Sequence, residues 1–188
     1  MTQSTTPINL EDVVGFLQET DIFSLLTPTE LSEITTILEF QRFAKDEVVF
    51  SEGDIGDAWY VLYEGALSVI KHVPFQKDRK VAVLQAPAVF GEMAILSSVP
   101  RSATIISKSN VVVMRFARRK FERLLEEGSL GAYKLALGMG VVLSDRHRLL
   151  TEQVAQLTQQ LDDIETSNDV DGENTDLFDR TDMFVIDK

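Results

Sequence analysis

The chain has 188 residues, 44% of them hydrophobic, no cysteine and a formal net charge of −12 at pH 7. Its length supports one buried core with extensions, and the absence of cysteine excludes disulfides, thiolate zinc sites and cysteine nucleophiles. The acidic balance argues against affinity for nucleic acid. No apolar run approaches the roughly 18 residues that span a bilayer, and the N-terminus lacks a signal-peptide pattern, so we expect a soluble, cytoplasmic protein.

Residues 1–39 carry apolar side chains at helical spacing in two sets. This spacing predicts two short N-terminal helices, with Thr29 and Glu30 ahead of the second. The residues that carry the pattern are Leu10, Val13, Val14, Leu17, Leu25, Leu31, Ile34, Ile37 and Leu38.

Residues 40–116 change to short runs of β-branched and aromatic residues. Turn formers separate the runs, among them Gly53-Asp54, Gly56-Asp57 and Glu64-Gly65. Short strands at close, regular spacing are typical of antiparallel barrels and jelly rolls. The fold class predicted is therefore mainly β with flanking α: an eight-stranded antiparallel β-barrel or jelly roll with N-terminal helices and a long C-terminal helix.

Helical spacing returns in residues 117–165. Steps of four and three residues alternate along a heptad seam made of Leu143, His147, Leu150, Val154, Leu157, Leu161 and Ile164. Such a seam predicts a homodimer through the C-terminal helix. The alternative, a helix that packs back on its own barrel, accounts for Leu135 to Leu143. It does not account for Leu150 to Ile164, where every position off the seam is polar except Ala155.

Residues 166–188 are predicted to form an acidic, flexible tail. Residues 162–188 contain ten acidic residues and only two basic ones, Arg180 and Lys188. Two apolar islands, Leu177-Phe178 and Met183 to Ile186, suit docking on an unknown effector protein, while a purely solubilising tail is the alternative.

The segment from Phe90 to Thr104 has the composition of an anion site. Gly91 and Glu92 stand at the start of a predicted one-turn helix, whose first amides and positive dipole end can cradle an anion. Arg101 can add a charge-assisted contact to phosphate oxygens. An acid in such a site fits a ligand that also carries a hydroxyl donor, as ribose does. The plain alternatives are a solvated Glu–Arg pair and a serine that bonds only the local backbone.

At these residues the chain resembles the cyclic-nucleotide-binding domain family, which includes bacterial catabolite activator proteins and protein kinase regulatory subunits. Gly53 to Asp57, Tyr60 to Leu62 and Gly65 match the family's barrel signature, and Phe90 to Ala103 matches its phosphate-binding cassette. The resemblance implies a cyclic mononucleotide ligand, cAMP first and cGMP as the other candidate. The ligand-binding residues that it implies are Gly91, Glu92, Met93, Ala94, Arg101, Ser102 and Ala103, with base contacts from Arg146 and His147.

The chain departs from the bacterial activators where their helix-turn-helix would begin, because the long helix here runs into acidic sequence. We therefore expect no contact with nucleic acid, and an output carried by another polypeptide. The lack of a long apolar run predicts no membrane insertion. Only His72 and His147 are present, too few for the metal centre of a cupin-type enzyme, so we expect no catalysis and no metal. Two hypotheses remain: a stand-alone receptor that relays ligand binding through its C-terminal helices to a partner, or a scaffold of the same fold with no or altered ligand.

Overall fold

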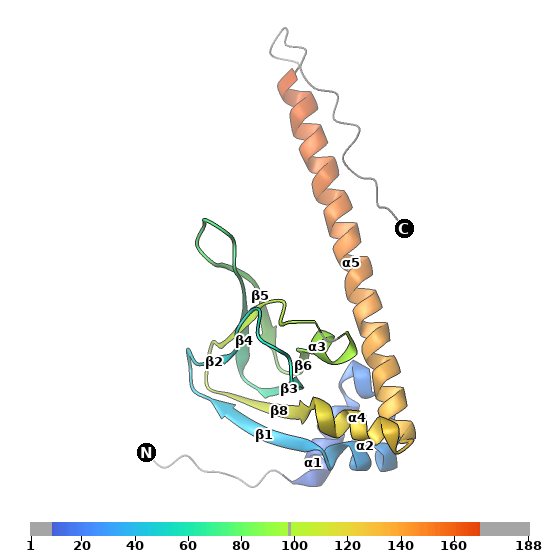
Figure 1. Cartoon of the computed structure of the whole chain (residues 1–188). Helices are drawn as coiled ribbons and strands as arrows, with labels where there is room; N and C mark the ends of the chain where they lie inside the picture. The colour runs from blue at the N-terminus through green and yellow to red at the C-terminus, as the bar shows by residue number, and fades with distance from the viewer. Residues whose placement is uncertain (1–8, 98, 170–188) are drawn as a thin grey trace. The chain divides into compact units, whose positions relative to one another are not determined.

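The computed structural model describes residues 9–97 and 99–169, which form two compact units, one ending at Leu143 and the other beginning at Ser144. The first unit opens with three short helices and closes with α4 and the first part of α5 (Figure 1). The helical elements are α1 (Leu10–Gln18), the 3-10 helix η1 (Asp21–Phe23), α2 (Pro28–Thr35), α3 (Met93–Leu96), α4 (Arg118–Glu126) and α5 (Leu130–Asp169).

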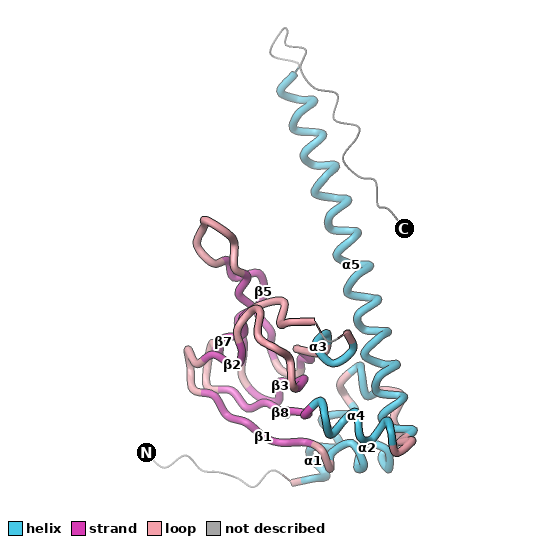
Figure 2. The backbone as a smooth tube through the Cα atoms, in the orientation of Figure 1, coloured by secondary structure: helices cyan, strands magenta, loops and turns pink. Residues whose placement is uncertain are grey.

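The strands lie between α2 and α4, as Figure 2 shows in magenta. They are β1 (Leu38–Phe43), β2 (Val48–Phe50), β3 (Ala58–Glu64), β4 (Ala66–Lys71), β5 (Arg79–Gln85), β6 (Ala88–Phe90), β7 (Thr104–Ser107) and β8 (Val111–Ala117). Every pairing is antiparallel. The predicted eight antiparallel strands with flanking helices are confirmed in the part of the chain that the structure describes.

Of the two forms predicted, barrel or jelly roll, the barrel is wrong, because the strands do not close on themselves. The strands form two sheets of four, in the orders β1-β8-β3-β6 and β2-β7-β4-β5, so each sheet keeps two edge strands. The two sheets meet through side chains rather than through backbone hydrogen bonds. Two of the edge strands, β2 and β6, are only three residues long and offer few backbone groups with which to bridge to the other sheet.

Strand β3 shows how one apolar run serves two cores. Successive side chains of a strand point to opposite faces, so alternate residues separate. Tyr60 and Leu62 belong to the core between the two sheets. Trp59 and Val61 belong to a second core, shared with side chains of α1, α2, α4 and α5. Both faces of β3 are covered, which explains why the run is continuously hydrophobic rather than alternating.

The helix boundaries differ from those predicted. Leu38, assigned from its spacing to the second helix, begins β1 and pairs with Phe116 of β8. Long helix α5 begins at Leu130 and continues through residues expected in the tail. Its Gly138 lies so close to η1 that a Cβ there would stand 2.4 Å from the Ile22 carbonyl oxygen, so this packing requires glycine. Among the described residues, no helix combines the length and apolar character needed to cross a membrane.

Candidate ligand site

The predicted anion segment links the two sheets. Strand β6 ends at Phe90, Gly91 turns the chain, α3 follows, and β7 begins at Thr104 in the other sheet. Gly91 has φ +76°, which L side chains rarely adopt, and a Cβ there would lie 2.6 Å from Arg101 Nη1. Glycine is therefore needed at this turn for its backbone conformation and for the room that it leaves to the arginine.

Arg101 lies inside the protein. It is only 5% exposed, and its guanidinium donates from Nη1 to the Gly91 carbonyl at 2.9 Å and from Nη2 to the Ala58 carbonyl at 2.7 Å. The guanidinium carbon lies 4.1 Å from the centre of the Phe50 ring and 5.6 Å from that of Tyr60. The arginine is thus held between the turn, the start of β3 and an aromatic surface.

The charge of Arg101 has no counter-ion among the described residues. No carboxylate there forms an ion pair with it, and its Nε is buried without a hydrogen-bond partner. Burial lowers the pKa of the Arg101 guanidinium, yet arginine keeps its proton at neutral pH. A buried cation with an unused donor is costly, and an anion that reached this guanidinium would reduce that cost.

Glu92 is also buried, at 6% exposure, and occupies the cap position just before α3. It is the neighbour of Gly91, whose carbonyl accepts from Arg101, so the fold brings the predicted ribose and phosphate residues to one turn. Helix α3 begins at Met93, which places the amides of Met93 and Ala94 in a first turn that has no acceptor within the helix.

The other predicted residues are more exposed. The Met93 side chain is 45% exposed, Ser102 is exposed and Ala103 is half-buried. The carbonyl of Ser102 accepts a hydrogen bond from Lys71 Nζ at 2.8 Å. Arg146 and His147 lie on α5 in the second unit, where both are exposed, and their role as base contacts stays a prediction.

The sequence analysis placed Tyr60 only within the barrel signature and did not indicate its contact with Arg101. Tyr60 stacks on Phe90 at 5.1 Å between ring centres, and Phe50 lies 5.8 Å from Tyr60. Phe50 and Tyr60 face the Arg101 guanidinium, and Phe90 stacks on Tyr60 behind them. The alternation of β3 could have indicated that Tyr60 and Trp59 face different cores, but the partner of Tyr60 depends on strand register.

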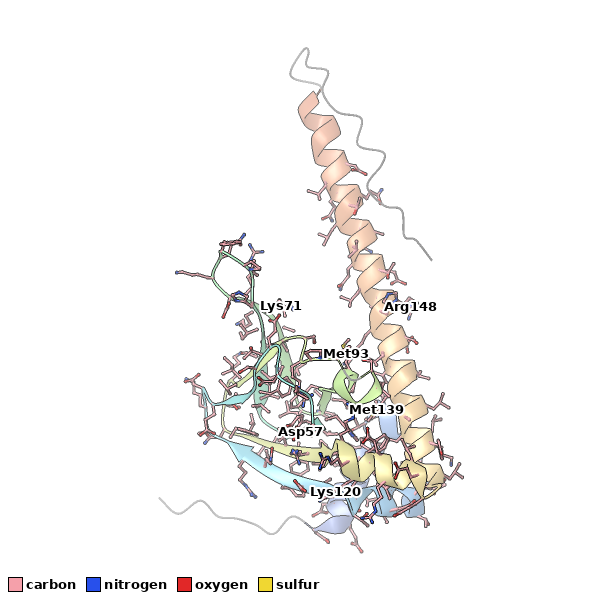
Figure 3. The ribbon with its side chains drawn as sticks, in the orientation of Figure 1. Asp57, Lys71, Met93, Lys120, Met139 and Arg148 are labelled. Carbon is pink, nitrogen blue, oxygen red and sulfur yellow. The ribbon has the colours of Figure 1, made fainter. Side chains whose placement is uncertain are left out.

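A second polar network, also missed from the sequence, joins the start of β3 to β8, β1 and α4. Arg115 bonds Asp57 at 2.6 Å and Glu39 at 3.0 Å, and Lys120 bonds the other oxygen of Glu39 at 2.7 Å. Asp57 and Lys120, both labelled in Figure 3, are its ends. Hydrogen bonds from Lys120 above all hold the pKa of Glu39 below its usual value. The network anchors the Gly56-Asp57 turn, from which β3 carries Ala58 and Tyr60 to Arg101.

The chain is similar to known proteins in sequence and in fold. Residues 40–128 match the family model described as "Cyclic nucleotide-binding domain". A cAMP-dependent protein kinase regulatory subunit of Hypocrea atroviridis is 38% identical over 111 residues, which is 59% of this chain and 23% of that protein. The chain thus spans less than a quarter of the length of this relative.

Solved structures share the fold at lower identity. A cyclic nucleotide-binding domain from Methylobacillus flagellatus has a TM-score of 0.69 and 21% identity over 78% of this chain and 82% of its own. The regulatory domain of Toxoplasma gondii protein kinase A, crystallised with cAMP, has a TM-score of 0.61 and 24% identity over 70% of this chain and 48% of its own.

Proposed function

Because residues 40–128 belong to the cyclic nucleotide-binding domain family, we propose that this chain is a regulatory receptor that binds a cyclic nucleotide, with cAMP as the preferred ligand, and catalyses no reaction. In this function, the C-terminal helices relay ligand binding to a partner protein in the cytoplasm. The receptor is the function that the geometry of the first unit supports best.

The buried, unpaired charge of Arg101 is the observation that carries the proposal. Its guanidinium is fixed by two carbonyl oxygens, which carry no net charge, and no described residue accepts a hydrogen bond from its Nε. A cyclic phosphate carries one negative charge and free oxygen acceptors, so it would pair directly with this cation, which Asp57 and Asp54 favour without forming an ion pair with it. In this proposal the first-turn amide of Ala94 and the Ser102 and Ala103 region complete the phosphate contacts.

Glu92 supplies the contact that would select a nucleotide over a simple phosphate. A carboxylate accepts hydrogen bonds, and the ribose 2′-hydroxyl donates one, so Glu92 beside Gly91 suits a ribose. Its burial holds the carboxylate at the turn beside Gly91 rather than in the solvent.

Preference for cAMP over cGMP rests on Ser102, the residue after the arginine, which resembles the bacterial cAMP receptors. The kinase regulatory subunit at 38% identity is also described as cAMP-dependent, which supports the same choice. Contacts from Arg146 and His147 to the base are part of this proposal.

The output is proposed to pass through a dimer. Four apolar side chains of the seam are between 60% and 62% exposed in the second unit, namely Leu150, Val154, Leu157 and Leu161. A second copy of the helix would cover them in a coiled coil. Docking of an effector on the acidic tail concerns residues 170–188, which lie outside the described residues.

The alternative is a scaffold that keeps the fold but binds no cyclic nucleotide. In a scaffold, the Arg101 guanidinium would serve only to join Gly91 to Ala58. The two proposals therefore differ in whether an anion ever reaches this side chain.

Calorimetric titration of the full chain with cAMP, cGMP and 2′-deoxy-cAMP separates them. The receptor predicts saturable one-to-one binding, tightest for cAMP and weakened by about tenfold or more for the 2′-deoxy ligand, since a lost hydrogen bond to a charged group costs roughly 1.5 to 3 kcal/mol. Absence of heat and of a thermal shift with both natural nucleotides would favour the scaffold. Equal affinity for the 2′-deoxy ligand would remove Glu92 from the site, and tighter binding of cGMP would reverse the order of preference.

A further inference from the structure

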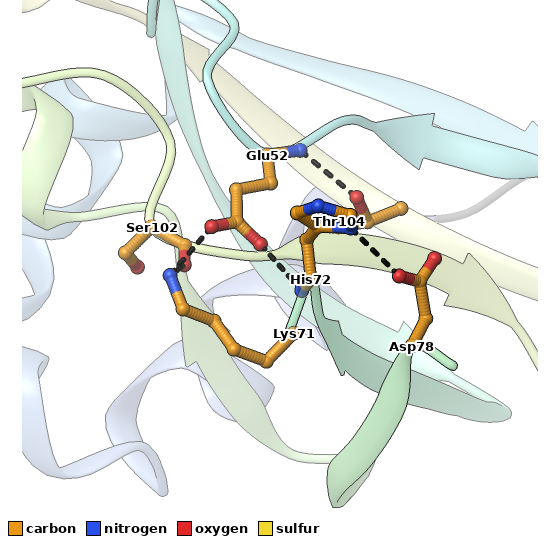
Figure 4. A network of polar contacts seen from close by, with 6 residues as sticks. All are labelled: Glu52, Lys71, His72, Asp78, Ser102 and Thr104. Atoms are coloured by element: carbon orange, nitrogen blue, oxygen red, sulfur yellow. Dashed lines mark hydrogen bonds and ion pairs between the residues drawn. The ribbon is translucent and has the colours of Figure 1, made fainter. Parts of the chain in front are cut away.

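A polar network reaches the backbone carbonyl of Ser102 (Figure 4). Ser102 directly follows Arg101 in the sequence. Lys71, the last residue of β4, donates from Nζ to the Ser102 carbonyl at 2.8 Å and to Glu52 Oε1 at 2.6 Å. The second oxygen of Glu52 accepts from the backbone amide of His72 at 2.9 Å. One carboxylate thus holds the end of β4, and the lysine that it holds reaches the predicted phosphate-binding segment.

The turn at residues 52–54 bonds the residues on both sides of Ser102. The Glu52 amide donates to Thr104 Oγ1 at 2.9 Å, and the Gly53 amide donates to the Arg101 carbonyl at 2.9 Å. In return the Arg101 amide donates to the Asp54 carbonyl at 2.8 Å. The segment from Arg101 to Thr104 is therefore tied to the turn at residues 52–54, and its Thr104 pairs with Ile70 of β4. Among the described residues of β4, Lys71 alone bonds the Ser102 carbonyl.

The Lys71–Glu52 pair is partly exposed, with side-chain exposures of 48% and 25%. Exposed ion pairs contribute little to the free energy of unfolding. The hydrogen bond from Lys71 is the main cause that holds the pKa of Glu52 below its usual value, so the carboxylate is charged at neutral pH. This pair contributes little to the free energy of unfolding, but its lysine contacts the predicted phosphate-binding segment. It is therefore suited to fixing the position of the Ser102 carbonyl.

We propose that Lys71 and Glu52 are positioning residues for ligand binding, which together hold the Arg101–Ser102 backbone where a cyclic phosphate can meet it. This inference rests on the proposed function and extends it to residues outside the cassette. Neither residue needs to contact the ligand. Glu52 acts through Lys71, and Lys71 acts through the carbonyl of Ser102.

Positioning and simple charge attraction predict opposite results for Glu52→Gln. If Lys71 served only as a cation near the phosphate, removal of the neighbouring negative charge would leave ligand affinity unchanged or raise it. If the pair positions Ser102, loss of the carboxylate releases the lysine, and affinity falls.

The experiment compares Lys71→Met, Glu52→Gln and the double variant with wild type in cAMP calorimetry. Each single variant is expected to weaken binding about tenfold, as loss of a charged hydrogen bond would. The double variant is expected to weaken it no further, because both changes open one contact. Lys71→Arg, which keeps the charge and the donors, is expected to stay within about twofold of wild type.

Lys80→Met is the matched control. Lys80 is an exposed lysine of β5, so the variant removes the same charge from the same hairpin while leaving Ser102 untouched. It is expected to bind like wild type. Unchanged or tighter binding by Glu52→Gln, or equal losses in Lys71→Met and Lys80→Met, would overturn the inference.

A ligand-free measurement separates this inference from the proposed function. Amide hydrogen exchange of Gly53 and Arg101, which bond each other's segments, is expected to lose protection in Lys71→Met and Glu52→Gln but not in Lys80→Met. If wild type binds no nucleotide, the proposed function fails while the exchange data still test the contact. Unchanged protection in both variants would overturn the positioning role whatever the ligand.

Discussion

The side chain of Arg101 joins three parts of the fold. Its guanidinium joins the carbonyl of Ala58 in β3 to that of Gly91 in the turn after β6, and it packs on Phe50 of the other sheet. The fold therefore holds the side chain before any ligand arrives. Such preorganisation reduces the entropy cost of binding, because a long side chain is already ordered.

Arg101→Ala is expected to abolish cyclic nucleotide binding. Loss of one partner of a desolvated charge pair costs roughly 3 to 5 kcal/mol of binding free energy. The free energy of unfolding is expected to change by only about 1 to 2 kcal/mol, because two carbonyls lose their donors while an unpaired buried charge is removed. Calorimetry and thermal denaturation measure the two effects separately.

Arg123→Ala, on an arginine of α4 that is 78% exposed, is the matched control and should bind like wild type. Arg101→Lys should bind between the two, since lysine keeps the charge and loses the planar fork. A folded Arg101→Ala protein with affinity within about twofold of wild type would contradict the phosphate assignment.

Polar side chains join α2 to the beginning of α5. Glu30 closes a capping box with Thr27 at the start of α2 and also accepts from Lys134 of α5 at 2.8 and 2.9 Å. Beside it, Ser129 Oγ donates to Glu33 at 2.9 Å. These contacts tie the N-terminal helices to the beginning of α5, the element through which an output is proposed to pass.

The stability that this contact contributes should depend on pH. The hydrogen bond from Lys134 is the first cause that holds the pKa of Glu30 below 4.5, its ordinary value. A lowered acid pKa means that the stabilisation is present above pH 4.5 and is lost as the pH falls through the lowered value. The melting temperatures of wild type and Lys134→Met should therefore differ at neutral pH and converge in acid.

Lys77→Met, which removes a lysine from the exposed β4–β5 loop, is the control for net charge. Its melting temperature should follow wild type at every pH. A gap between wild type and Lys134→Met that persists unchanged in acid would show that the lysine acts by packing rather than through Glu30.

At the scale of the whole molecule, the acidic charge and the apolar seam act in opposite directions. Net charge of −12 keeps copies of the chain apart, whereas exposed Leu150, Val154, Leu157 and Leu161 gain from being covered. The charge is concentrated beyond residue 161, so most of the seam lies outside the most acidic stretch.

The full chain is expected to sediment as a dimer at micromolar concentration. Leu157→Asp should shift it to a monomer, because it places a charge in the apolar seam, whereas Gln159→Asp, off the seam, should leave the dimer intact. Analytical ultracentrifugation distinguishes the two masses. A wild-type chain that is monomeric at tens of micromolar would exclude the seam as a self-association surface.

Some features followed from residues that are near one another in sequence. The short β-branched and aromatic runs between turn formers, the spacing by three and four along α5, and the glycine, acid and arginine around α3 are patterns of residues close together in the sequence. From them the sequence predicted the mainly antiparallel β class, the long C-terminal helix and the grouping of Glu92 with Arg101. The domain limits and the base contacts stay predictions.

Other features depended on strand register and on the packing of the two sheets. Arg101 meets the carbonyl of Ala58 across 43 residues, and Lys71 meets that of Ser102 across 31. No local periodicity reports such a pair, because a shift of one residue in register turns every side chain to the other face. The sequence by itself therefore predicted which residues would form an anion site. Only the tertiary structure decided that Arg101 is buried without an ion-pair partner among the described residues, and that the two sheets stay open.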